Sequence, residues 1–209
     1  MAVVDSTYKF IFADIGAQGR ISDRGIFRNT VFWNMLSNNT LNLPAPRPLP
    51  GSNMDMPFVF LGDGAFALHT HIMKPYPGNH DKNSPERIFN KKLSGSRVIV
   101  ENTFGILASR FQIFKRPIEL CPEKASAITL TCILLHNYLI SSKTSSQIYF
   151  PEGTVDVYDN NDTLIQPGSW REKIASTSAI QNMPPVARRA SASANQVREE
   201  FNNYFFNMR

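Results

Sequence analysis

The chain has 209 residues, 42% of them hydrophobic, which is enough for one domain with a buried core. A net charge of +5 suits a polyanionic partner such as DNA, although an ordinary surface can carry the same charge. The sequence has no apolar run of about 18 residues and no signal segment after Met1. We therefore expect a soluble intracellular protein without a membrane partner.

Short apolar runs indicate strands, and longer periodic stretches indicate helices. In the first half we expect strands over 2–15, a helix over 24–36 capped by Ser22 or Asp23, a proline-rich extended loop over 37–56, a strand over 57–62, a strand or short helix over 67–73 and a loop over 75–85. A helix should start at Ser84-Pro85 and run to 93, with a break or a kink at Gly95. Beyond it we expect a long helix over 96–114, a buried helix over 122–141 and a short helix over 195–206. Residues 142–194 are polar and weakly periodic, which predicts a mostly irregular segment.

Two acids occupy positions at which a strand and a helix can present them. Asp63 ends an apolar run, so we expect a buried strand to deliver it to its C-terminal edge. Glu101 has Arg97 four residues before it and Gly105 four after it, and on a helix these three share one face. That face would carry a carboxylate, a guanidinium and a bare backbone that a bulky group can approach. The two acids could hold a divalent cation; a turn at Asp63 and a helix ion pair at Glu101 are the alternatives.

An ordered set of sequence motifs surrounds these acids. The motifs are Ala2-Val-Val-Asp-Ser-Thr-Tyr-Lys-Phe10, Asp14-Ile-Gly-Ala-Gln-Gly-Arg-Ile-Ser-Asp-Arg-Gly-Ile-Phe-Arg28, Leu61-Gly-Asp-Gly-Ala-Phe-Ala-Leu68, Met73-Lys-Pro-Tyr-Pro-Gly78, Ile88-Phe-Asn-Lys-Lys-Leu-Ser94, the Glu101 helix, Leu134-Leu-His-Asn-Tyr138 and Val197-Arg-Glu-Glu-Phe-Asn-Asn-Tyr-Phe205. Together they resemble the DDE-type endonuclease domain of PIF/Harbinger transposases and the host proteins derived from them. The resemblance implies an α/β fold of RNase H type, with a mixed sheet flanked by helices. It also implies DNA cleavage by three acids, Asp, Asp and Glu, which bind two metal ions.

The resemblance assigns Asp63 and Glu101 as the second and third acids and leaves the first without a counterpart. In the family the first Asp lies in an Asp-Gly motif upstream of the segment with which this chain begins. Asp14 also ends an apolar run, but it aligns with a turn after a later strand and is not assigned. We therefore expect a partial DDE domain over 1–141 that lacks its first strand, followed by a polar C-terminal region over 142–209.

Two carboxylates are too few for the two-metal centre that stabilises the attacking and leaving oxygens of a phosphodiester. We expect one weakly held Mg²⁺ or Mn²⁺ and an inactive isolated chain. Three hypotheses remain open: a Harbinger-type nuclease domain without its N-terminal part, a catalytically dead DNA- or protein-binding module derived from a transposon, and a non-functional remnant that folds poorly because its sheet has an unpaired edge.

Basic residues around the predicted catalytic helix are the candidates for DNA contact. They include Lys91, Lys92, Arg97 and Arg110, which could each neutralise a phosphate or only form a solvated surface. The sequence has no helix-turn-helix or zinc-finger motif. The resemblance accordingly implies that a separate Myb/SANT-like protein reads the DNA sequence, and it implies the nucleus as the location, with the cytoplasm as a second compartment.

Histidines and cysteines give weaker signals. His69 and His71 would share one face of a strand, but no further Cys or His lies at zinc-ligand spacing. His136 is better explained as a hydrogen-bonded core histidine than as a catalytic base. Cys132 lies in an apolar run, which favours a buried reduced thiol over a disulfide. Phe104 and Phe111, seven residues apart, are better explained as core than as a base-stacking surface.

Overall fold

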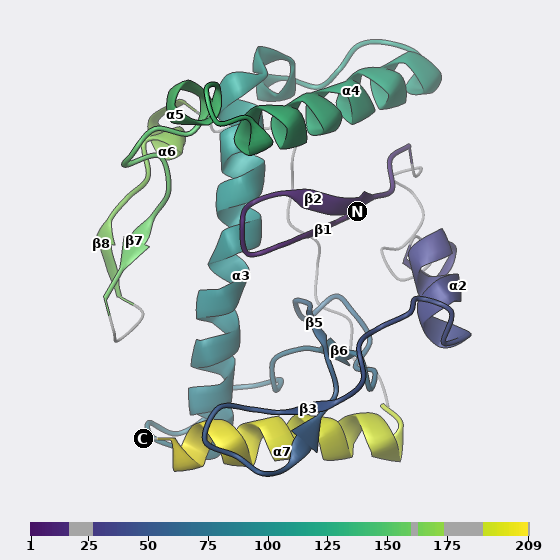
Figure 1. Ribbon diagram of the computed structural model, residues 1–209, viewed down its shortest axis with the longest axis vertical. Coiled ribbons are helices and arrows are strands. Elements are labelled where there is room, and N and C mark those ends of the chain that lie inside the picture. Colours follow the sequence, from purple (N-terminus) through teal and green to yellow (C-terminus); the bar gives the residue numbers. More distant parts are fainter. Residues whose placement is uncertain (17–26, 160–162, 174–189, 209) are drawn as a thin grey trace. The chain divides into compact units, whose positions relative to one another are not determined.

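The computed structural model describes residues 1–16, 27–159, 163–173 and 190–208 (Figure 1). Over these residues the structure is mixed α/β, and the described strands pair as four two-stranded sheets. The elements are β1 (Ala2–Val4), β2 (Phe10–Ala13), α2 (Val31–Ser37), β3 (Arg47–Pro48), β4 (Asp55–Met56), β5 (Phe60–Leu61), β6 (Ile72–Met73), α3 (Pro85–Arg110), a 3-10 helix (Gln112–Lys115), α4 (Pro122–Ser141), α5 (Ser146–Tyr149), β7 (Val157–Tyr158), β8 (Leu164–Gln166), α6 (Trp170–Lys173) and α7 (Ala192–Asn207). The α/β class is confirmed.

The chain divides into two compact units, and the boundary falls inside α3. Unit 1 comprises Met1–Gln18 and Val98–Asn182, and unit 2 comprises Gly19–Arg97 and Met183–Arg209. The predicted boundary at residue 141 is the end of a family domain, and a division into compact units does not test it. That boundary stays a prediction. Among the described residues, no helix is long and apolar enough to cross a membrane.

Unit 1 is built on a hairpin and two helices. β1 and β2 pair antiparallel, and the Asp5 side chain accepts hydrogen bonds from the Thr7 and Lys9 amides in the turn between them. This hairpin is the predicted pair of strands. Its core gathers buried residues of β2, α3, the 3-10 helix and α4: Phe10, Leu107, Ala108, Phe114, Cys132 and Ile133. Phe104 and Phe111 pack against this core, as predicted, and the buried Cys132 is a free thiol.

His136 and Asn137 of α4 bind the backbone of the hairpin. The Asn137 side chain accepts from the Phe10 amide at 2.9 Å and donates to the Phe10 carbonyl at 2.8 Å, as a neighbouring strand would. His136 is fully buried and donates from Nε2 to the Tyr8 carbonyl at 2.7 Å. Because a carbonyl only accepts, Nε2 carries a proton. Burial lowers the pKa of His136 and favours the neutral ring, in which Nδ1 accepts from the Tyr149 hydroxyl at 2.8 Å. His136 is therefore a core histidine, as predicted.

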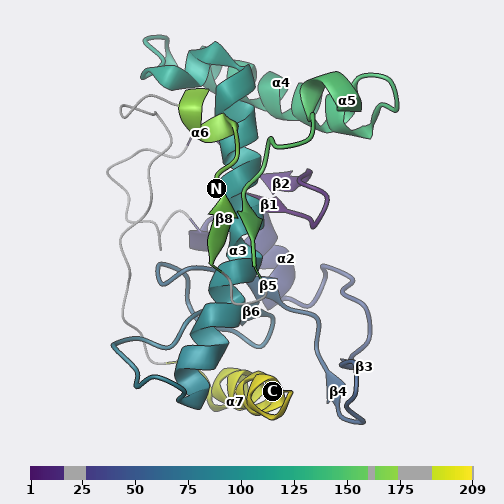
Figure 2. The same cartoon turned by 90° about the vertical axis from the view of Figure 1, so that its left-hand side faces the viewer.

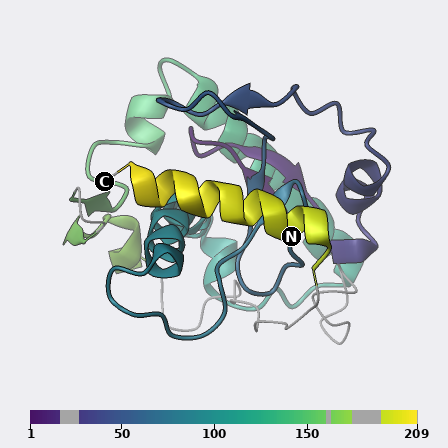
Figure 3. The same cartoon turned by 90° about the horizontal axis from the view of Figure 1, so that it is seen from below.

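Unit 2 packs α7 against the N-terminal part of α3, and Figure 3 shows α7 crossing it. The core residues of this unit come from β4, β6, α3 and α7: Met56, Met73, Phe89, Leu93 and Phe201. β5 and β6 pair parallel, with Phe60 opposite Ile72. The predicted terminal helix is confirmed, and its apolar face contributes Phe201, with Val197 and Phe205 packed beside it.

α3 begins where the sequence predicts but does not break where the sequence predicts. Ser84 accepts from the Arg87 amide, and Pro85 is the first helical residue. The predicted break at Gly95 is wrong, because α3 continues through this residue to Arg110. A glycine within a helix costs only about 1 kcal/mol relative to alanine, which packing on both sides of Gly95 can offset.

Two further predictions need correction. The single helix over 24–36 is interrupted, because Thr30 accepts from the Trp33 amide and caps α2 anew; Ser22 and Asp23 lie outside the described residues. α4 is not buried on most faces, since Leu130, Leu134, Leu135 and Tyr138 are between 44% and 68% exposed. The described part of the polar segment after residue 141 contains the short elements α5, β7, β8 and α6, and its mostly irregular character stays a prediction.

Candidate functional site

Asp63 lies just beyond the end of a strand, as the sequence predicts. The strand itself is not buried as predicted, because Leu61 is 41% exposed and Phe60 is only half-buried. Asp63 follows β5, and the Gly62 amide extends the pairing by donating to the Met73 carbonyl at 2.8 Å. One carboxylate oxygen accepts from the Ala65 amide at 2.8 Å, which closes a tight turn. Because β5 and β6 are parallel, Asp63 after β5 and Lys74 after β6 lie at the same edge.

Three cations surround this edge. Arg97 of α3 approaches the second Asp63 oxygen at 3.8 Å, with both side chains about a quarter exposed. Lys74 donates from Nζ to the Gly64 and Phe66 carbonyls at 3.0 and 2.9 Å, which holds its charge over the turn. Burial and then the charge of Arg198 lower the pKa of Lys74, while Asp63 raises it. The Asp63 carboxylate therefore lies in a strongly cationic environment.

Glu101 is exposed on α3, one turn after Arg97 and one turn before Gly105. The predicted shared face of these three residues follows from the continuous helix. The structure brings Asp63 together with Arg97, both in unit 2. Glu101 belongs to unit 1, and its meeting with Asp63 around a metal ion stays a prediction.

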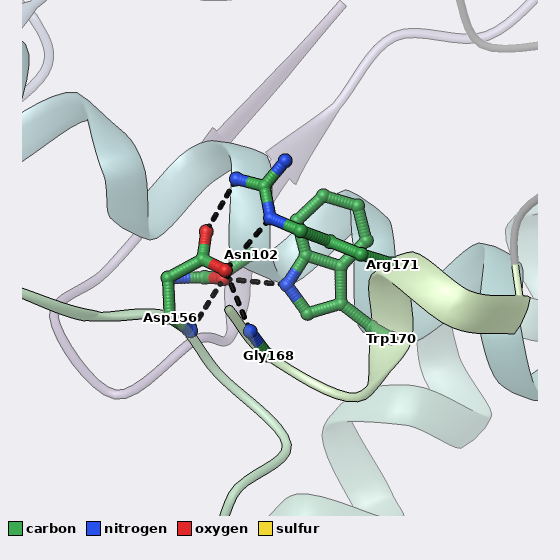
Figure 4. Close-up of polar contacts among 5 residues, drawn as sticks. All are labelled: Asn102, Asp156, Gly168, Trp170 and Arg171. Carbon is green, nitrogen blue, oxygen red and sulfur yellow. Dashed lines mark hydrogen bonds and ion pairs between the residues drawn. The ribbon is translucent and has the colours of Figure 1, made fainter. Parts of the chain in front are cut away.

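A buried polar network lies against the helix turn that carries Glu101 (Figure 4). Asn102 accepts through one oxygen from the Trp170 indole at 2.7 Å and from the Asp156 amide at 3.2 Å. The Asp156 side chain has no exposed surface and accepts two hydrogen bonds from Arg171, at 2.8 and 2.6 Å. It also accepts from the Gly168 amide at 2.8 Å. The network ties Asp156, Trp170 and Arg171 to α3, and α6 lies beside this part of α3 (Figure 2).

The network explains why position 105 is a glycine. A Cβ atom there would lie 2.3–2.8 Å from atoms of the Trp170 indole, so only a bare backbone fits. The sequence predicted that a bulky group could approach Gly105, and Trp170 is that group. Asp156, Trp170 and Arg171 were not predicted, because they lie in the polar segment that lacks periodicity.

Charge couples this network to Glu101. Burial would raise the pKa of Asp156, but the hydrogen bonds from Arg171 and Gly168 hold it below its usual value. The Asp156 hydrogen bond and then the charges of Asp156, Tyr158 and Glu101 raise the pKa of Arg171, against burial. The Arg171 side chain is 39% exposed and its guanidinium lies 4.5 Å from the Trp170 ring centre. A fixed guanidinium thus lies in the field of Glu101.

The predicted DNA-contacting residues differ in their surroundings. Lys91 and Lys92 are exposed on α3. Arg97 is engaged with Asp63, whereas Arg110 is half-buried and lies over the Tyr149 ring at 5.7 Å. Lys91 and Lys92 are therefore open to a ligand, and Arg110 has a packing role.

The described residues offer few ligands for a metal ion. No group of three His, Cys, Asp or Glu side chains gathers in residues 1–16, 27–159, 163–173 and 190–208. His71 donates from Nδ1 to the Phe58 carbonyl at 2.9 Å, and His69 accepts from the His71 amide at 3.2 Å, so local hydrogen bonds account for one nitrogen of each ring. In this part of the chain the donor set does not by itself fit a two-metal centre.

Comparison with known proteins identifies the family. The model of the DDE superfamily endonuclease family matches residues 1–137, which is well over half of the chain. The chain belongs to this family. Its members generally use divalent metal ions and act on nucleic acid.

Curated relatives agree with the resemblance to Harbinger-derived proteins. The human protein named "Putative nuclease HARBI1" is 38% identical over 81 residues, which are 37% of this chain and 22% of that protein; the bovine protein of the same name gives the same values. The Arabidopsis thaliana "Protein ALP1-like" is 25% identical over 141 residues, 66% of this chain and 34% of that protein. The chain thus spans about a fifth to a third of the length of these relatives. No solved structure matches it.

Proposed function

We propose that this chain is a metal-dependent DNA endonuclease domain of Harbinger type, in which Asp63 and Glu101 are the second and third catalytic acids. The observation that carries the proposal is Asp63 at the edge of β5 and β6 with Arg97 of α3 beside it. The match over residues 1–137 supports phosphodiester hydrolysis as the reaction. An RNase H-like arrangement of the complete domain, action in the nucleus and a Myb/SANT-like partner belong to the same proposal.

The residues have separate roles in this proposal. Asp63 and Glu101 each supply one carboxylate for a divalent cation, Mg²⁺ or Mn²⁺, and a DNA phosphate would pair with Arg97 once the cation takes its place at Asp63. Oxygen ligands are those that Mg²⁺ prefers, but one carboxylate on each side binds it weakly. We therefore propose that the 209-residue polypeptide holds one cation weakly and does not cut DNA.

A calorimetric titration with Mn²⁺ tests the assignment of the two acids. We expect weak binding by the unmodified chain and loss of that binding in Asp63→Asn and in Glu101→Gln. Glu123→Gln on α4 is the matched control, since it removes an equally exposed acid that has no proposed role. Binding that survives Asp63→Asn or Glu101→Gln would refute the assignment.

A nicking assay on supercoiled DNA tests the proposed inactivity. We expect no nicking by the 209-residue polypeptide in Mg²⁺ or Mn²⁺. Cutting that Glu101→Ala abolishes would show that this chain contains the first acid, with Asp14 as the first candidate. In a longer form that includes an upstream Asp-Gly strand, Asp63→Asn and Glu101→Gln should abolish cutting without changing the circular dichroism spectrum.

The second candidate function is a catalytically dead module that binds DNA or protein. The Arg97–Asp63 ion pair favours it, because the guanidinium stands beside the carboxylate oxygen that would bind metal. This function predicts salt-sensitive retention of DNA that Asp63→Ala leaves unchanged. It also predicts no effect of Mn²⁺ on thermal stability.

A further inference from the structure

A cationic cavity lies in unit 2, between the loop before α3 and the first turns of that helix. Its volume is about 420 Å³, and the side chains that line it are all polar or basic: Asn79, His80, Arg87, Asn90, Lys91 and Ser94. None of the lining residues is an Asp or a Glu. A cavity with this lining is suited to an anion.

The spacing on α3 explains why these residues meet. Arg87, Asn90, Lys91 and Ser94 follow one another at i, i+3, i+4 and i+7, which places them on one face of the helix. The helix therefore presents two permanent positive charges and two neutral polar groups to the same space. Arg87, Lys91 and Ser94 are exposed, so the cavity is open to solvent.

Asn90 holds in place the loop before α3, which forms one wall of the cavity. Its side chain accepts from the Tyr76 amide at 2.7 Å and donates to the Tyr76 carbonyl at 3.0 Å. The Tyr76 ring packs edge-on against buried Phe89, and the Arg198 guanidinium lies 4.0 Å from the centre of the same ring. The cavity is thus shaped before any ligand binds, which reduces the entropy lost on binding.

One lining residue, His80, has a ring nitrogen without a hydrogen-bond partner. Nε2 of His80 is buried and unpaired in the described structure. A buried polar atom without a partner is unfavourable, and an oxygen of a bound anion would supply the missing acceptor. His80, Arg87 and Lys91 together offer the charged and neutral donors that a phosphate group requires.

We propose that this cavity binds a backbone phosphate of DNA. The inference deepens the proposed function, on which it rests for the choice of DNA over other phosphate compounds. A phosphodiester in an open cavity leaves both neighbouring nucleotides in solvent, which an enclosed site for a small phosphate would not allow. Binding at this cavity would be independent of DNA sequence, because a phosphate carries no base information.

Fluorescence anisotropy with a labelled DNA duplex tests the cavity in the full chain. The variant is Arg87→Gln/Lys91→Gln, and the control is Lys82→Gln/Lys143→Gln, which removes the same charge from exposed residues outside the lining. We expect the slope of log affinity against log salt to become shallower by about 0.9 for each lost phosphate contact in the variant, with a smaller change in the control. The Arg87→Gln/Lys91→Gln variant should lose the same affinity for duplexes of different sequence. Equal changes in variant and control would overturn the proposal, as would failure of the unmodified chain to bind DNA.

A second measurement needs no substitution. In the ¹H–¹⁵N spectrum of the His80 ring, addition of a 12-base-pair duplex should shift the Nε2 resonance, and unmoved ring signals during DNA binding would overturn the proposal. A parallel titration with inorganic phosphate distinguishes free phosphate from DNA as the ligand. If micromolar phosphate shifts the Nε2 resonance and DNA does not displace it, the cavity is a site for free phosphate and the proposal fails. The Mn²⁺ titration of Asp63 and Glu101 does not depend on this cavity, so each proposal can fail without the other.

Discussion

The close contact between Gly105 and Trp170 gives a sharp test of how α6 is attached to α3. In Gly105→Ala the new Cβ atom would lie 2.3 Å from the nearest indole atom, and ordinary contacts begin at 3.4 Å. The indole must retreat by roughly 1 Å, a displacement that would strain or break its 2.7 Å hydrogen bond to Asn102.

The magnitude follows from three effects. Overpacking costs about 1–3 kcal/mol, and the lost hydrogen bond costs about 0.5–1.5 kcal/mol. Alanine in a helix interior recovers about 1 kcal/mol relative to glycine. We expect Gly105→Ala to lower the free energy of unfolding by roughly 2 kcal/mol, although glycine-to-alanine changes in helices usually stabilise.

A double-mutant cycle with Trp170→Ala separates these effects. Without the indole, Gly105→Ala should stabilise by about 1 kcal/mol, because only the helix propensity remains. The change in sign between the two backgrounds measures the contact directly. Urea unfolding followed by circular dichroism at 222 nm gives the four free energies, and the slopes must agree for the comparison to hold. A coupling energy below about 0.5 kcal/mol would refute the packing of Trp170 on Gly105.

Three further predictions concern buried groups of unit 1. Asp156→Asn should lower stability by about 1–3 kcal/mol near neutral pH; because folding lowers the pKa of this carboxyl, the deficit should shrink in urea titrations as the pH falls below about 4. Tyr149→Phe should lower the melting temperature, because it removes the hydroxyl that donates to His136. Burial lowers the pKa of His136 in the folded state, so the unfolded state binds protons more readily and the unmodified protein should lose stability as the pH falls below about 6.5. In urea unfolding, Ile133→Ala should lower the free energy of unfolding by about 2–5 kcal/mol, and Leu134→Ala on the exposed side of α4 by less than about 0.5 kcal/mol. Equal decreases for the two variants would contradict the exposure of Leu134.

Local signals predicted the elements whose causes are local. The start of α3 at Ser84-Pro85 follows from a cap and a fixed φ angle, both of which act within one helical turn. The strand before Asp63 follows from a short apolar run that ends in a turn. The predicted break at Gly95 was wrong, because a glycine only weakens a helix and the packing around it decides whether the helix continues.

Long-range contacts are where sequence patterns failed. The carboxylate of Asp156 is buried because Asn102, 54 residues earlier, binds its amide and Arg171 binds its side chain. Nothing within the polar segment indicates these partners. The apolar composition of α4 predicted burial on most faces. In the structure α4 buries only the side that meets the hairpin, and Leu134 lies on the exposed side.

The ion pair at Asp63 bears on how a metal ion could bind there. A pair at 3.8 Å between side chains that are both about a quarter exposed contributes at most about 1 kcal/mol, because water screens it and two mobile side chains must be fixed. Arg97 is therefore a weak competitor for the carboxylate. Lys74 is held by two carbonyl groups and cannot follow the carboxylate as Arg97 can. A divalent cation could displace Arg97 at small energetic cost, and the released guanidinium would then be free to pair with a phosphate at the same edge of β5 and β6.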